Sequence, residues 1–291
     1  MSIAGPISLT SSLSRGRRVR NRLATAGVWL SVAAAVVPLG FIVAYLVQQG
    51  GRVVDWAFLT EDIPIISRGG GPGMGPAVLG TLLITGAATL MAVPLGVLAA
   101  TYLNEYGGKR RLAGTIRLMA DVMAGVPSIV MGLFVYSVYV LRFGQRGFAG
   151  ALALGCLMLP IVIRSAETAL QLVPNELREA STALGARTSR TILTVVVPAA
   201  LPGIVSGALL AVARAAGETA PLLFTIGIVN AANPNLFDGT NTALSAQIFS
   251  NARLPFLAAQ QRAWGAAFTL VALVFLLTAV ARVIARRFTV R

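Results

Sequence analysis

Six long apolar windows without a charged residue limit the fold of this chain more strongly than any other feature. They cover Leu23–Gly51, Gly69–Asn104, Val122–Leu141, Gly147–Ile163, Thr191–Ala213 and Ala263–Ala281. A membrane-spanning helix needs roughly 17–25 apolar residues. A chain of 291 residues that is 56% apolar also has more apolar surface than one soluble core can bury. The windows therefore predict an all-α polytopic membrane protein with six transmembrane helices, the fourth of which runs on past Arg164.

Positive charge is concentrated in the segments on one side of these windows. Of the 24 lysine and arginine residues, that side holds Arg15, Arg17, Arg18, Arg20, Arg22, Lys109, Arg110, Arg111, Arg117, Arg164, Arg178, Arg187, Arg190, Arg282, Arg286, Arg287 and Arg291. The other side holds only Arg52, Arg68, Arg142, Arg146, Arg253 and Arg262. Because cytosolic loops carry the excess of Lys and Arg, both termini are expected in the cytosol. The positive residues behind the net charge of +14 are distributed according to the side of the membrane, so this charge does not indicate nucleic-acid binding.

Cysteine and histidine usage excludes several classes of function. Cys156 is the single cysteine and lies in a window, so an internal disulfide is excluded and a packing role is expected. The chain has no histidine, which counts against a His-based proton relay or metal site. The basic residues before the first window are similar to a secretory signal, but that window has the length of a full span and is interpreted as an anchor.

Two segments on the expected outer side are polar. Residues 48–76 end in a glycine-rich run, Gly69 to Gly75, which lacks the Gly-Lys-Ser/Thr ending of a nucleotide loop and is interpreted as a flexible turn. Residues 230–262 include the amphipathic stretch Ala243–Ala252, which predicts an interfacial helix. A docking surface for an external partner is the alternative for this loop. Elsewhere, small residues such as Gly203 and Gly207 are expected to bring helices into close contact.

A charged hairpin interrupts the apolar sequence near residues 174–187. Asn175 is the expected N-cap of a short helix with Glu176 and Glu179 in its first turn, and Gly185 is expected just past its end. The next helix is expected to begin at Thr188 or Ser189. The sequence alone leaves open whether this elbow is a plain loop or a lever that receives force from a soluble partner.

The hairpin resembles a family signature. Glu179-Ala180-Ser181, Gly185 and Pro198 match the spacing of the Glu-Ala-Ala, Gly and Ile-x-Leu-Pro motif of bacterial ABC importer permeases, with Ser181, Val195 and Val197 as departures. In that family the segment is the coupling helix that packs into a groove of the ATP-binding subunit. The resemblance therefore implies that Glu179, Ala180 and Gly185 couple this chain to an ATPase.

Two further segments, Asp121–Val130 and Ala213–Leu223, indicate a particular group within this family, because they resemble the corresponding segments of phosphate importer permeases of the PstA type. It covers roughly Pro76 to the carboxy terminus and implies the type I ABC importer permease fold. The chain is accordingly divided into a basic cytosolic tail (1–22), a first transmembrane helix with an external loop (23–75) and an ABC importer transmembrane domain (76–291).

Arg214 and Glu218 lie inside apolar sequence, four residues apart and hence on one helical face. A charge near the bilayer centre costs roughly 2.5–3.5 kcal/mol on insertion scales, so the two need a partner or a purpose. One interpretation is an ion pair that fixes helix packing. The other is a transient anion site, in which the guanidinium of Arg214 binds phosphate oxygens and Glu218 pairs with it between cycles.

Three more charged residues lie near the expected membrane boundary. Arg164 is similar in placement to a second arginine of the phosphate permeases, and a boundary anchor and a role in the substrate pathway both stay open for it. Arg117 and Asp121 are also four residues apart and are expected to have a structural role.

Together these features predict the permease subunit of an ATP-driven inorganic phosphate importer, a multi-pass protein of the bacterial inner membrane that works by alternating access and is not an enzyme. The resemblance implies a sister permease (PstC-type), an ATPase dimer that binds ATP and Mg²⁺ (PstB-type) and an external phosphate-binding protein (PstS-type). No cofactor or metal is expected on this chain. The alternatives are a permease for another oxyanion and an ion-coupled secondary transporter, for which Glu218 is the only carboxylate clearly within an expected span.

Overall fold

A computed structural model describes residues 15–69, 71, 73–108 and 110–288, and the chain divides into two compact units, Met1–Gln48 and Gln49–Arg291. The described part of the first unit is the portion of helix α1 (Arg15–Gly50) that ends at Gln48, and Pro38 is internal to this helix. Its apolar side chains, including Trp29 and Phe41, are exposed within that unit, as expected for a helix surrounded by an apolar medium. Arg15–Arg22, which the sequence assigned to the basic tail, belong to α1, and residues 1–14 lie outside the described residues.

The second unit is a bundle of helices, and no strand occurs among its described residues. Its first half consists of α2 (Trp56–Thr60), α3 (Gly75–Thr101), the π-helical segment η1 (Tyr102–Tyr106), α4 (Arg111–Gly125), α5 (Ser128–Val135), the π-helical segment η2 (Tyr136–Val140), α6 (Leu141–Phe143) and α7 (Gly147–Gln171). Its second half consists of α8 (Asn175–Ala183), α9 (Thr188–Thr191), the π-helical segment η3 (Ile192–Val196), α10 (Val197–Gly217), α11 (Ala220–Thr225), α12 (Leu244–Ala252) and α13 (Leu257–Phe288).

Among the described residues, 5 helices are long and apolar enough to cross a membrane, and a bent pair raises the number to 6. The bent pair is Arg111–Gly125 with Ser128–Phe143, which meet at 105°. The window Val122–Leu141 is therefore a broken helix and not the straight span that its composition suggests. Pro127 explains the break, because it disfavours helical geometry at Val126, whose ψ is 127°.

A second break separates α10 from α11. Glu218 caps α10 with an extended ψ of 130°, and Pro221 lies in the first turn of α11. The two short helices that follow the breaks pack on each other, since a Cβ added to Gly132 of α5 would lie 2.6 Å from Cα of Pro221. The glycine is required at this contact, because a side chain there would overlap backbone atoms.

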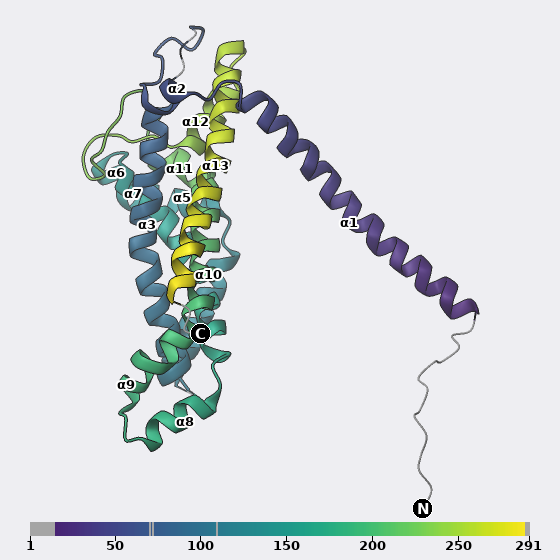
Figure 1. The fold of residues 1–291 in the computed structure, drawn as a ribbon. Helices are drawn as coiled ribbons and strands as arrows, with labels where there is room; N and C mark the ends of the chain where they lie inside the picture. The colour runs from purple at the N-terminus through teal and green to yellow at the C-terminus, as the bar shows by residue number, and fades with distance from the viewer. Residues whose placement is uncertain (1–14, 70, 72, 109, 289–291) are drawn as a thin grey trace, which may run out of the picture. The chain divides into compact units, whose positions relative to one another are not determined.

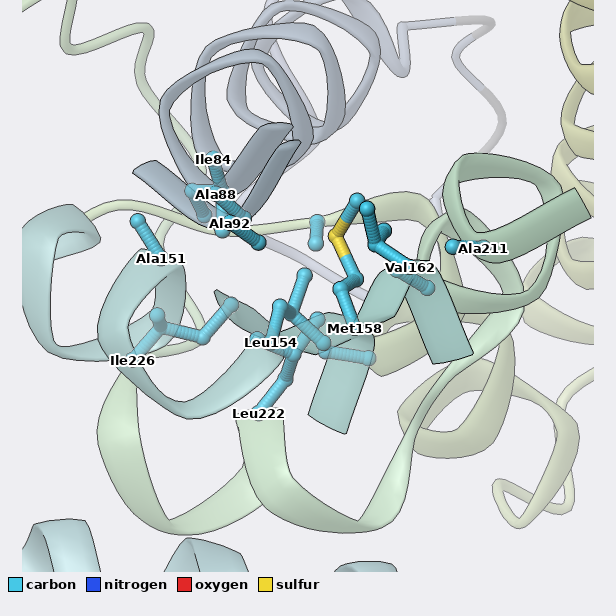
Figure 2. Close-up of a cluster of buried hydrophobic side chains, with 13 residues drawn as sticks. Ile84, Ala88, Ala92, Ala151, Leu154, Met158, Val162, Ala211, Leu222 and Ile226 are labelled. Carbon is cyan, nitrogen blue, oxygen red and sulfur yellow. The ribbon is translucent and has the colours of Figure 1, made fainter. Parts of the chain in front are cut away.

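Helix α7 forms the centre of the main hydrophobic core. Figure 2 shows Leu154 and Met158 of α7 beside Ile84, Ala88 and Ala92 of α3, and the cluster also includes Leu222 of α11 and Ile226, which directly follows α11. Most of the α3 residues in this cluster are alanine, so the two helices approach closely.

Glycines also bring α10 against α7, as the small-residue pattern predicted. A Cβ at Gly203 would lie 2.7 Å from Cβ of Ala169, and a Cβ at Gly207 would overlap the side chain of Ser165. The two glycines are one turn apart on α10 and their partners are one turn apart on α7, so the helices are in contact over at least one full turn. This contact fixes the position of the middle of α10 relative to α7.

The two ends of the bundle differ in construction. Figure 1 shows α8 and α9 at one end, and α2 with the loop that precedes α12 towards the other. Helix α12 buries Ser245, Gln247 and Asn251 together with Leu244 and Ala246, so the prediction of an interfacial helix is wrong. Its polar side chains are satisfied internally, for example by the hydrogen bond from Gln247 Nε2 to Thr242 Oγ1 at 3.0 Å. The amphipathic pattern reflected a buried polar face.

Candidate transport site and coupling segment

The hairpin between α7 and α10 begins and ends close to where the sequence predicted. Pro174 and not Asn175 is the N-cap of α8, because Asn175 is already helical and its Oδ1 accepts from Arg178 Nη1 at 3.3 Å. Gly185 follows the helix end with φ of 78°, a left-handed conformation that glycine adopts without a Cβ clash. Helix α9 begins at Thr188. Glu179, Ala180 and Gly185 are all exposed, as a docking segment requires.

Arg178 fixes this hairpin to the bundle, a role that sequence reasoning missed. Its Nη2 donates to Glu105 Oε1 at 2.9 Å and to the carbonyl of Leu170 at 3.1 Å, while its Nη1 donates to the carbonyl of Val173 at 2.6 Å. Glu105 lies in η1 and its side chain is only 9% exposed. A carboxylate directly after the long window Gly69–Asn104 was the available signal for this ion pair.

Arg164 lies on α7 between two carboxylates. Its Nε and Nη2 both donate to Asp121 Oδ1, the first at 2.9 Å, and its Nη1 donates to Glu167 Oε2 at 3.2 Å. Glu167 lies one turn further along α7 and its side chain is 4% exposed, whereas the Arg164 and Asp121 side chains are 41% and 56% exposed. Sequence reasoning did not select Glu167, because it lies after Arg164 where the apolar window had already ended.

Arg117 and Asp121 do not pair with each other, although their spacing on α4 suggested it. Arg117 Nε donates to Glu167 Oε1 at 2.7 Å and its Nη2 to the carbonyl of Leu103 at 3.0 Å, while Asp121 binds Arg164. Both residues therefore bind α4 to α7, each through a partner on α7 and not through each other. Glu167 accepts from two arginines and is the centre of this network.

A cavity of about 810 Å³ opens beside Arg164. Its wall combines α7, α10 and α13 with Ala124 of α4, and it includes the hydroxyl side chains of Ser165, Thr168, Ser206 and Thr278. Arg164 and Arg282 are its two charged lining residues among those described. The volume greatly exceeds the ≈ 30 Å³ that one water molecule takes in the liquid, so the cavity can hold a hydrated ion.

Arg214 and Glu218 form a looser pair at the break between α10 and α11. Arg214 Nε lies 3.5 Å from Glu218 Oε1, and the side chains are 69% and 17% exposed. Glu218 follows the last helical residue, Gly217, and its backbone carbonyl accepts from Ser245 Oγ at 2.9 Å. The ion pair predicted from the four-residue spacing is present, but the helix that was expected to carry both residues ends between them.

The two arginine sites are neighbours along one wall. Ile161, one turn before Arg164, lines both the large cavity and the small pocket that contains Arg214 and Glu218. Guanidinium groups and hydroxyls are donors and suit an oxyanion. Among the described residues, no group of three His, Cys, Asp or Glu side chains is placed to hold a metal ion. The arrangement is that of a helical protein with membrane-spanning segments and two arginine side chains along one wall.

Comparison with known proteins agrees with this class. Residues 92–290 match the family model described as binding-protein-dependent transport system inner membrane component. The chain is 42% identical, over 90% of its length and 86% of the relative's, to phosphate transport system permease protein PstA 1 of Mycobacterium tuberculosis strain H37Rv. It is 40% identical, over 92% of its length and 90% of the relative's, to the PstA permease protein of Yersinia pestis.

Solved structures support the fold alone. A bacterial alginate ABC transporter chain aligns with TM-score 0.66 at 14% identity, over 93% of this chain and 96% of that one. A chain of the inward-facing MetNI methionine ABC transporter aligns with TM-score 0.60 at 20% identity, over 74% of this chain and 94% of that one.

The protein is therefore a polytopic permease subunit of the ABC importer class, located in the bacterial inner membrane, and is not an enzyme. The chain belongs to the family of binding-protein-dependent transport system inner membrane components and, within it, to the group of PstA permease proteins.

Proposed function

We propose that this chain is the membrane-spanning subunit through which an ATP-driven importer passes inorganic phosphate. The observation that carries the proposal is Arg164 on the wall of an 810 Å³ cavity, in a chain whose relatives are named phosphate transport permeases. Cargo with several anionic oxygens suits the forked donors of arginine. The cavity supplies volume and hydroxyl groups for a hydrated anion.

The hairpin at residues 174–187 transmits the movement of the ATPase subunits to the transport pathway. The exposed residues Glu179, Ala180 and Gly185 contact an ATPase dimer (PstB-type), which binds the ATP and Mg²⁺, while this chain binds no cofactor. The ion pair of Arg178 with Glu105, at 2.9 Å, makes the hairpin move with the end of α3. The π-helical segments η1 and η3 flank this joint, and such segments occur frequently at functional sites.

The chain works with partners on both sides of the membrane. A sister permease (PstC-type) supplies the other half of the pathway, and a phosphate-binding protein (PstS-type) delivers substrate to the outer face. The arginine-rich segments and the hairpin lie in the cytosol together with both termini, in agreement with the positive-inside rule.

Arg214 provides a transient anion site between the outer face and the cavity. Its side chain is 69% exposed and its carboxylate partner is 3.5 Å away, so an arriving phosphate can compete for the guanidinium. Glu218 pairs with Arg214 when substrate is absent. As an acceptor it also favours an anion that carries a proton, such as hydrogen phosphate, over fully deprotonated sulfate.

The test uses the complete importer in proteoliposomes, with binding protein outside and ATP inside. Arg214→Gln is expected to abolish ATP-driven phosphate uptake and to leave assembly of the complex intact, because Arg214 makes a single weak ion pair. Arg142→Gln, which removes one exposed positive charge from α6, is the matched control and should transport normally. Unchanged uptake by Arg214→Gln contradicts the proposed site. Uptake that continues without ATP but stops when the proton gradient is removed contradicts the ABC mechanism.

A further inference from the structure

The two carboxylates that bind Arg164 differ in how firmly they are held. Glu167 is 4% exposed and binds a second cation, because its Oε1 accepts from Arg117 Nε at 2.7 Å. Asp121 is 56% exposed, and among the described residues its carboxylate accepts hydrogen bonds only from Arg164. Arg164 thus has one fixed partner on its own helix and one loosely held partner on α4.

This difference decides which partner can leave. Removing a buried carboxylate from two arginines exposes an uncompensated charge and is strongly unfavourable. An exposed carboxylate exchanges its ion pair for water at little cost, since exposed pairs contribute only about 0–1 kcal/mol. Asp121 can therefore move away from Arg164 while Glu167 holds the guanidinium in position.

The edge of Arg164 that Asp121 occupies is suited to an oxyanion. Nε and Nη2 converge on one oxygen, Asp121 Oδ1, and a guanidinium presents the same pair of donors to a phosphate oxygen. The remaining donor, Nη1, is bound to Glu167. Ala124, one turn after Asp121 on α4, lines the cavity that Arg164 also lines. An anion in this cavity can reach the Nε and Nη2 edge when Asp121 leaves it.

We propose that Asp121 is a displaceable internal anion, which holds the substrate-binding edge of Arg164 between transport cycles and returns to it to expel the transported oxyanion. Glu167 is the positioning residue that keeps the guanidinium in place in both situations. The inference rests on the proposed function, because it requires that an oxyanion reaches Arg164. In addition, the affinity of Asp121 for Arg164 determines how readily the oxyanion is released.

The experiment is equilibrium binding of radiolabelled inorganic phosphate to the purified, nucleotide-free importer without the binding protein. Asp121→Asn keeps the shape but removes the competing charge. It should bind phosphate more tightly than the wild type by up to about fivefold, the factor that corresponds to the upper end of an exposed pair's contribution, about 1 kcal/mol. ATP-driven uptake by the same variant should slow, because release becomes harder. Asp121→Glu restores the competing charge and should move both values back towards those of the wild type.

Two controls separate this inference from the proposed function. Asp238→Asn removes one exposed carboxylate from the loop before α12 and should leave phosphate binding unchanged. Arg164→Gln should lose both binding and uptake. Asp121→Asn binding that is no tighter than wild type, while Arg164→Gln still abolishes uptake, overturns the displaceable anion and leaves the proposed pathway standing. Normal uptake by Arg164→Gln removes Arg164 from the pathway and overturns both.

Asp121→Ser provides a second test if the asparagine variant does not assemble. Serine cannot reach the guanidinium as a carboxylate does, so it also frees the Nε and Nη2 edge. Tighter phosphate binding by this variant supports the inference, and unchanged or weaker binding overturns it.

Discussion

Arg164 and Arg214 line adjoining parts of one wall, but the two cations differ in the number of their carboxylate partners and in their exposure. Arg164 lies within a continuous helix and binds two carboxylates through three nitrogens. Arg214 lies near the end of α10 and has one carboxylate at 3.5 Å, with 69% of its side chain exposed. The first site is a network that joins α4 to α7. The second is a lightly paired cation beside a helix break.

The difference indicates how a permease can combine rigidity with anion passage. A cation in a network contributes to the fold, and its buried partner holds it in position even when an exposed partner leaves. A cation with one weak partner contributes little to the fold and is available to the substrate. Substitutions should therefore lower stability more at the first site than at the second, whereas transport depends on both sites.

The largest expected difference in stability between the two sites comes from neutralising their carboxylates, Glu167 and Glu218. Glu167→Gln leaves Arg117 and Arg164 without their shared partner. Breaking a buried pair costs about 3–5 kcal/mol, and the 35% and 41% exposure of the two arginines reduces our expectation to about 2–3 kcal/mol through solvent screening. Glu218→Gln should cost less than about 1 kcal/mol, because its partner is mostly exposed. Thermal stability of the detergent-solubilised importer, followed by size-exclusion chromatography, measures both.

An equal loss of stability in the two variants would show that Arg214 is also part of a structural network, one completed by another subunit. Glu176→Gln, which removes an exposed carboxylate from α8, controls for the loss of one negative charge.

A smaller effect is expected from the contact that sets the spacing of the two sites. Gly207→Ala adds a Cβ that overlaps the side chain of Ser165, whereas Gly86→Ala adds one with nothing within 4 Å. Overpacking costs about 1–3 kcal/mol, so Gly207→Ala should lower the same thermal stability and also slow uptake by displacing α10 from α7. Gly86→Ala is the matched control and should be neutral. Normal uptake by a fully stable Gly207→Ala importer would mean that the α7 to α10 spacing is not critical.

The sequence predicted the helical membrane fold, the hairpin and the Arg214 to Glu218 pair, because each depends on local pattern. The length of the apolar windows predicted the spans, and Gly185 predicted the end of the short helix. The spacing of four residues predicted the ion pair of Arg214 and Glu218. The family signature at Glu179 and Ala180 identified the segment expected to dock on an ATPase. Whether these residues contact a partner stays a prediction.

The network around Glu167 was beyond sequence reasoning, since it depends on which helices are neighbours. Arg117 and Asp121 have a helical spacing that suggests a mutual pair, but α7 offers each of them a partner. The break at Pro127 is a different case, because the length of an apolar window is the same whether its helix is straight or bent, and only the proline marks the break. Tertiary neighbours decided the partners of Glu167, whereas a local residue decided the break.

The smallest effect is expected from replacing each arginine with lysine, which keeps the positive charge and removes only the forked geometry of the guanidinium. Arg164→Lys cannot bind Asp121 and Glu167 together, because an ammonium is a compact charge without the planar fork. The loss of one net hydrogen bond should lower the stability of the importer by about 1 kcal/mol. Arg214→Lys should change it by about 0.5 kcal/mol or less, since a mostly exposed pair contributes little. Both are measured as thermal stability beside the parent importer. A larger loss for Arg214→Lys than for Arg164→Lys would reverse the assignment of the structural and the available cation, and would indicate that Arg214 binds a fixed partner in the assembled importer.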